Sequence, residues 1–79
     1  MRLDKFLKVS RVIKRRPVAN EVCDSQRVSI NGKIAKASTT VKVGDIIEIK
    51  FGDKISKFEV LSIKEFAHKD EASEMIKIL

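Results

Sequence analysis

Residues 27–35 read RVSINGKIA, and the pattern of the chain changes there. Asn31-Gly32 lies between two short runs of β-branched residues, which is the strongest short-range signal of a β-hairpin. Apolar residues recur at helical spacing before this stretch and alternate along strands after it. A strict two-residue turn would pair Ile30 with Lys33, and the sequence leaves open a bulge or a longer loop that shifts this register.

Two short helices are expected before the hairpin. In the first, Leu3, Phe6 and Leu7 share one face, and the helix is expected to end or bend near residues 8–10. The second is expected over residues 17–25, because proline favours the first turn of a helix. Its buried side should hold Val18, Ala19, Val22 and Cys23, and its solvent side Asn20, Glu21 and Asp24.

Strands and turns are expected after the hairpin. Turns at Gly44-Asp45 and Gly52-Asp53 bound a strand with Ile47, Ile49 and Phe51 on one face. The apolar phase of the returning strand slips between Val60 and Leu61, which predicts a β-bulge.

The tail, residues 65–79, carries the last periodic pattern. Ala72, Met75, Ile76 and Leu79 follow the i, i+3, i+4, i+7 rule of an amphipathic helix. The sequence thus predicts an α+β fold: a domain over residues 1–64, with two N-terminal helices on a small, mostly antiparallel sheet, followed by a tail with a short helix.

Composition limits the class of protein. A chain of 79 residues forms one small domain, and 43% hydrophobic with 35% charged residues suits an ordered, soluble protein. No apolar run approaches the roughly 20 residues that span a bilayer, and the N-terminus is too charged for a secretory signal. The single Cys23 cannot form an internal disulfide. We therefore expect a cytoplasmic protein.

The charge is unevenly distributed. Residues 1–45 hold eleven Lys and Arg against four Asp and Glu, a net charge of +7, whereas residues 46–79 hold six against seven. Seven cations lie in residues 1–16, where Asp4 is the only acid. This polarity predicts a binding face for an acidic polymer, with nucleic acid favoured over an anionic membrane surface.

An enzyme is not indicated. The chain has no Walker loop, no GxSxG and no GxGxxG motif, so no cofactor is implied. Cys23 lies on an apolar helix stripe, where a buried small side chain explains it, and His68 lies far away in the sequence. One cysteine and one histidine also fall short of a zinc site.

The run KRRP at residues 14–17 places Lys14, Arg15 and Arg16 at the start of a helix, where the dipole disfavours cations. The same helix end, with its free N–H groups and two fork-shaped guanidinium groups, suits a phosphate. The run therefore predicts a phosphate-backbone partner. Further cations recur at Arg2, Lys5, Lys8 and Arg11. Lys50, Lys54 and Lys57, by contrast, fit an ordinary solvated face.

The type of nucleic acid follows from what the chain lacks. There is no Trp or Tyr, and three of the four Phe fit core positions, so no stacking platform for single strands is evident. Glu21 and Asp24 on the second helix would repel a DNA duplex. Recognition of folded RNA through its backbone and shape is the favoured interpretation.

Four segments in this order resemble the S4 RNA-binding domain: RLDKFL, KRRPVANEV, RVSINGKIAK and VKVGDIIEI. The resemblance covers residues 2–50. Many S4 domains have Ser or Thr at the position of Pro17, so the second helix is expected to lack a side-chain cap. A chain with little beyond this domain is similar to the small bacterial ribosome-associated S4 proteins of quality control and heat shock.

The resemblance implies a non-enzymatic factor that binds 23S rRNA and peptidyl-tRNA on a free 50S subunit after a stalled ribosome has split. It further implies support for C-terminal alanine tailing, beside a factor that recruits alanyl-tRNA. By position, Arg2, Asp4, Lys5 and Arg16 match the RNA-contacting motif, with Asp4 capping the first helix or orienting an arginine. Lys33 and Lys36 fit a supporting phosphate role.

Three alternatives remain at this stage. The chain could act as a heat-shock-type protein that recycles stalled 50S subunits, or as a general rRNA assembly factor. It could instead be a protein–protein adaptor that uses its acidic tail, residues 65–74. A monomer is the default expectation for so small a module.

Overall fold

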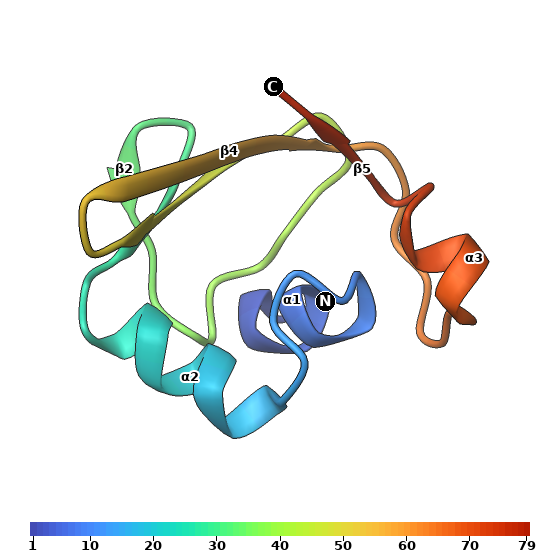
Figure 1. Ribbon diagram of the computed structural model, residues 1–79, viewed down its shortest axis with the longest axis horizontal. Coiled ribbons are helices and arrows are strands. Elements are labelled where there is room, and N and C mark those ends of the chain that lie inside the picture. The colour runs from blue at the N-terminus through green and yellow to red at the C-terminus, as the bar shows by residue number, and fades with distance from the viewer.

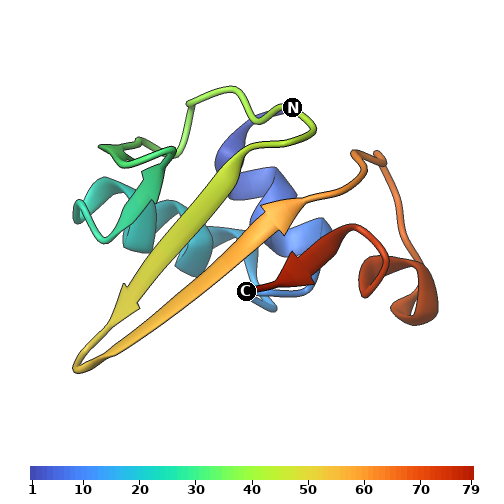
Figure 2. The ribbon, with the colours of Figure 1, turned by 90° about the horizontal axis from the view of Figure 1, so that it is seen from above.

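The computed structural model describes residues 1–79 and has three helices and five strands. The helices are α1 (Leu3–Val9), α2 (Arg16–Asp24) and α3 (Lys69–Ala72). The strands are β1 (Val28–Ile30), β2 (Lys33–Ile34), β3 (Ile46–Phe51), β4 (Lys54–Val60) and β5 (Ile76–Ile78). All strand pairs are antiparallel, in the order β2-β1-β3-β4-β5. Helices α1 and α2 lie against one face of this sheet, as Figures 1 and 2 show, so the predicted α+β class is confirmed.

The two N-terminal helices follow the sequence pattern closely. Helix α1 ends at Val9 with Ser10 as its C-cap, and α2 begins at Arg16 without a side-chain cap, as the proline at position 17 suggested. The expectation that Val18 is buried is wrong, because this side chain is 44% exposed. A helix turns by about 100° per residue, and the buried side of α2 is already filled by Ala19, Val22 and Cys23. No helix is long and apolar enough to cross a membrane.

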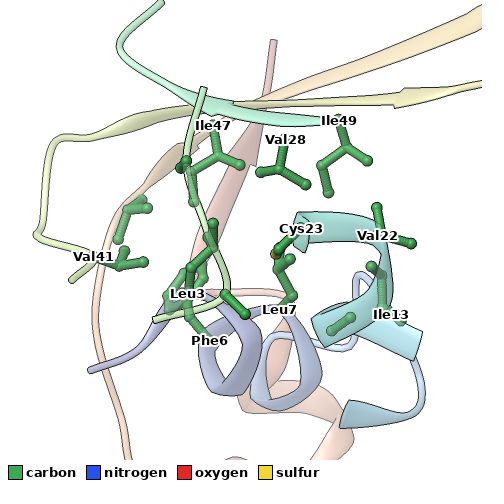
Figure 3. Close-up of a cluster of buried hydrophobic side chains, with 14 of the residues drawn as sticks. Leu3, Phe6, Leu7, Ile13, Val22, Cys23, Val28, Val41, Ile47 and Ile49 are labelled. Carbon is green, nitrogen blue, oxygen red and sulfur yellow. The ribbon is translucent and has the colours of Figure 1, made fainter. Parts of the chain in front are cut away.

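The core lies between these helices and the sheet. Figure 3 shows side chains of α1 and α2 pointing at those of β1 and β3. Its fully or almost fully buried members include Leu3, Phe6, Leu7, Val22, Cys23, Val28, Ile47 and Ile49. Phe51 continues the apolar face of β3 but is 40% exposed, since the β3–β4 hairpin runs past the helices.

The β1–β2 hairpin has the strict two-residue turn, with Ile30 paired to Lys33. Asn31 and Gly32 both have positive φ angles, 52° and 84°, as a type I′ turn requires. The Asn31 side chain also accepts a hydrogen bond from the Ile46 N–H (2.9 Å) and donates one to Asp45 (3.1 Å). This residue therefore shapes the turn and also attaches it to the start of β3.

The C-terminal residues complete the sheet. The N–H groups of Leu61 and Ser62 both donate to the Met75 carbonyl, at 2.8 and 3.3 Å, which is the two-to-one pairing of the expected β-bulge. The amphipathic helix expected in the tail is present only as α3, and the expectation is wrong beyond Ala72, because Ile76–Ile78 form β5 against β4. Pairing with an open sheet edge satisfies this backbone, whereas four or five residues of isolated helix would be marginal in water.

Candidate nucleic-acid interface

Asp4, in the first turn of α1, is the centre of the basic N-terminal region. Its carboxylate is nearly inaccessible, with the side chain 3% exposed, yet it has polar partners from both helices. It accepts hydrogen bonds from the Lys5 N–H (2.8 Å) and from Asn20 Nδ2 (3.2 Å). It forms ion pairs with Arg2 Nε (3.3 Å) and Arg16 Nε (3.5 Å). We call Arg2, Asp4, Arg16 and Asn20 the Asp4 cluster.

These contacts fix the ionisation state of Asp4. Burial alone would raise the pKa of this carboxyl group, but the hydrogen bonds from Asn20 and the Lys5 N–H and the charges of Arg16 and Arg2 outweigh burial, so the pKa of Asp4 is lowered. The group is therefore a carboxylate at neutral pH. Of the two roles considered for it, the structure supports orientation of arginines, since α1 has no side-chain cap.

The cluster presents two guanidinium groups on one surface. The side chains of Arg2 and Arg16 are 51% and 47% exposed, so each has one edge toward Asp4 and the rest toward solvent. Arg16 is also the first residue of α2, whose N-terminal N–H groups have no side-chain cap. Oriented guanidinium groups beside a helix N-terminus form a site for an anion such as a phosphate.

The other predicted cations fall into three groups. Lys8, Arg11 and Lys14 are exposed and line a hollow between the α1–α2 loop and the tail, and Arg15 is exposed as the N-cap residue of α2. Lys33 and Lys36 are exposed at and after β2, with no contact to the Asp4 cluster. Lys5 differs from all of these, because its ammonium group is paired with Glu65 from the tail.

The Lys5–Glu65 pair joins residues 60 positions apart in the sequence. The Glu65 pKa is lowered by the hydrogen bond and the charge of Lys5, so Glu65 is a carboxylate at neutral pH. In this structure Lys5 is therefore a cation with an acidic partner, and the RNA contact that the family resemblance implies for it stays a prediction.

Asn20 is a member of the site that sequence reasoning missed, since it was expected to face water. It is half-buried and donates to Asp4. A signal was present, because Asn20 follows Arg16 by four residues and positions i and i+4 share one helix face. No comparable signal marks the Glu65 contact, which depends on the path of the tail.

Cys23 has no features of a nucleophile. It is buried in the core, and burial, followed by the charges of Asp4 and Asp24, raises its pKa to about 11. A thiol is reactive as the thiolate, and a raised pKa disfavours that form. We therefore interpret Cys23 as a buried core side chain.

Known proteins resemble this chain over its whole length. Residues 1–47 match the S4 domain family. A Halalkalibacterium halodurans protein named RQC P-site tRNA stabilizing factor is 53% identical over 78 residues, which cover 99% of this chain and 89% of that protein. The Bacillus subtilis protein of the same name is 54% identical over 79 residues, covering 100% and 92%.

A solved structure agrees with the sequence comparisons. The structure of heat shock protein 15 from Vibrio cholerae, described as trimeric, matches with a TM-score of 0.91 and 28% identity, and covers 100% of this chain and 81% of that one. The family match spans helices α1 and α2, the β1–β2 hairpin and the start of β3. This range includes every residue of the Asp4 cluster. The chain belongs to the S4 domain family.

Proposed function

We propose that this protein binds RNA on the large ribosomal subunit and stabilises a P-site tRNA there. The names of its bacterial relatives describe them as factors that stabilise a P-site tRNA. This protein acts by binding, without catalysis, in the cytoplasm where ribosomes are found. The observation that carries the proposal is the Asp4 cluster, in which a buried carboxylate holds Arg2 and Arg16 beside the start of α2. That arrangement suits phosphates of folded RNA.

The finer proposal is a role in ribosome-associated quality control. The RNA partners are 23S rRNA and a peptidyl-tRNA on a 50S subunit left by splitting, and the protein holds this tRNA during C-terminal alanine tailing, beside a factor that recruits alanyl-tRNA. Sequence identity favours this role over the heat-shock one, because the tRNA-stabilizing relatives are 53% and 54% identical to this chain and the heat shock protein is 28% identical. In this assignment the protein acts as a monomer.

Co-sedimentation tests the proposal. The wild type and the Arg16→Ala variant are incubated with 30S subunits, 50S subunits and 50S subunits bearing peptidyl-tRNA. We expect preference for the tRNA-bearing 50S particle and a loss of about 1–3 kcal/mol in the variant, the scale of one charge-assisted contact. The matched control is Arg27→Ala, an exposed arginine that follows the C-terminal end of α2. Equal binding to all particles, or full binding by Arg16→Ala, contradicts the proposal.

A heat-shock-type role is the second candidate, favoured by the likeness to the Vibrio cholerae protein. It predicts the same particle preference, so alanine tailing in cell extract separates the two. Extract depleted of the protein should lose tailing under the quality-control proposal and retain it under the heat-shock one. An adaptor that uses the tail would bind its partner equally well with Arg16→Ala.

A further inference from the structure

A hollow of about 900 Å³ lies away from the Asp4 cluster, between the α1–α2 loop and the segment that leads into α3. We call it the tail groove. Two opposing segments supply the side chains that matter here: Lys8, Arg11 and Lys14 on one side, and Phe66, His68 and Lys69 on the other. Figures 1 and 2 show α3 and the preceding segment beside the helical layer, apart from the β3–β4 hairpin.

The tail groove carries excess positive charge. Two carboxylates also line it, but Glu65 pairs with Lys5 and Glu71 pairs with Lys64 Nζ at 3.4 Å. None of the four groove cations takes part in an ion pair; these are Lys8, Arg11, Lys14 and Lys69. Four unpaired cations around one hollow repel each other, and a polyanion placed between them would relieve that repulsion.

Phe66 is the unusual side chain of the tail groove. It is 88% exposed, although phenylalanine is among the residues most often buried, and it lines the same hollow as four cations. The sequence offered no stacking platform, but the structure leaves most of this side chain exposed. An aromatic ring beside a cationic groove is how many proteins hold unpaired nucleotides, with the base on the ring and the phosphates on the cations.

Arg11, which lines the tail groove, has an unusual backbone conformation. It follows the C-cap of α1 with a φ of +62°, a conformation in which helices usually place glycine or asparagine. This left-handed conformation is unfavourable for a residue that carries a side chain. Arg11 follows the end of α1 and begins the loop whose cations line the tail groove together with Phe66.

We infer that the tail groove is a second RNA site, which takes an unpaired nucleotide by stacking its base on Phe66 and holding the flanking phosphates with Lys8, Arg11, Lys14 and Lys69. This inference rests on the proposed function only in that the partner is RNA. It adds single-strand recognition at a place distinct from the Asp4 cluster, whose guanidinium groups suit the backbone of folded RNA.

The chain contains no tryptophan, so Phe66→Trp introduces a unique fluorophore at the groove. The ligand is single-stranded oligoadenylate of about six nucleotides, within the usual site size, and a fully paired RNA duplex is the comparison. We expect saturable quenching by the single strand and little by the duplex. The matched control, Phe51→Trp, places the same fluorophore on a partly exposed phenylalanine of the β3–β4 hairpin and should not respond.

Affinity for the labelled oligoadenylate gives the second readout. Phe66→Ala should weaken binding roughly 5- to 150-fold, equivalent to the loss of one stacked base at about 1–3 kcal/mol, and Phe66→Trp should retain it. The control variant Arg27→Ala, at an exposed arginine outside both sites, should leave oligoadenylate affinity near that of the wild type. Circular dichroism of each variant verifies the fold.

The outcomes separate the two proposals. Binding of oligoadenylate without a fluorescence response, or with equal affinity in Phe66→Ala, refutes the groove site. No binding at low salt refutes it as well. Quenching by polyglutamate in place of RNA would make the groove a protein-binding surface and overturn the inference. In each of these cases the Asp4 cluster is still judged separately, by co-sedimentation of Arg16→Ala with 50S particles.

Discussion

Replacing Asp4 with asparagine separates two opposite effects on RNA binding. The carboxylate is a negative charge next to the proposed phosphate site, so its removal should favour an anion by about 0.5 kcal/mol at a distance of about 8 Å in water. It also fixes the Arg2 and Arg16 side chains, and immobilising a long side chain on binding costs about 0.5–1.5 kcal/mol. Because the substitution releases two arginines, the cost of ordering their side chains on binding should exceed the gain from removing the negative charge.

The expected net result is RNA binding weakened by roughly 1–2 kcal/mol, or about 5- to 30-fold. The assay is co-sedimentation of Asp4→Asn with the tRNA-bearing 50S particle. Asp45→Asn is the control, because Asp45 also accepts a backbone hydrogen bond, from the Lys42 N–H at 2.8 Å, but has no arginine partner. Unchanged or tighter binding by a folded Asp4→Asn variant would refute the orienting role.

The same substitution should also lower the free energy of unfolding. The amide that replaces the carboxylate keeps only part of the hydrogen bonding with Asn20 and the Lys5 N–H, and we expect this loss to cost about 1–3 kcal/mol. The ion pairs with the half-exposed arginines contribute little to stability, because solvent screens them. The folded-state pKa of Asp4 is lowered, so its stabilising effect is complete above the unfolded pKa of about 3.9 and is lost as pH falls through the folded value. Urea unfolding of both proteins should therefore differ at pH 7 and converge in strong acid.

Three further predictions concern charge and the tail. Binding to the 50S particle should weaken steeply with salt, with a log–log slope of about −0.7 to −0.9 per phosphate contacted; a flat response would indicate a protein partner. Glu65→Gln should tighten RNA binding in a filter-binding titration, because it frees Lys5, and the gain should be smaller once Lys5→Ala is also present, where only the loss of the Glu65 charge remains. Met75→Ala should lower the free energy of unfolding by about 2–5 kcal/mol in urea, since the side chain is fully buried, whereas a separable tail would leave stability unchanged.

The N-terminal half of the fold was predictable from local pattern. The apolar spacing of α1 and the Asn31-Gly32 turn each depend on neighbouring residues, and their predicted positions are confirmed to within a residue or two. Val18 is a local failure of this reasoning. Hydrophobicity marks a residue as able to be buried, but the position of the helix relative to the sheet decides which apolar side chains are covered.

The candidate site was predictable in composition but not in arrangement. The cations of residues 2–16 were apparent as a group from their charge alone. That Arg2 and Arg16 share one carboxylate depends on the packing of α1 against α2, which places the first turn of one helix beside the first turns of the other. Until that packing is known, Lys5 and Arg16 look equivalent, although Lys5 is paired with Glu65 of the tail and Arg16 with Asp4.

The tail shows most clearly where sequence reasoning stops. The spacing of Ala72, Met75 and Ile76 fits a helix. The same three residues also fit a turn followed by a strand. An open edge on β4 decides between them, because it offers hydrogen bonds to a chain that returns at the correct register. Once β5 is anchored there, the segment before it is brought to the cationic loop, where it places Glu65 on Lys5 and leaves Phe66 exposed. Deleting residues 65–79 would therefore remove a core residue and a sheet strand, so single substitutions in the tail are the sharper test of its part in RNA binding.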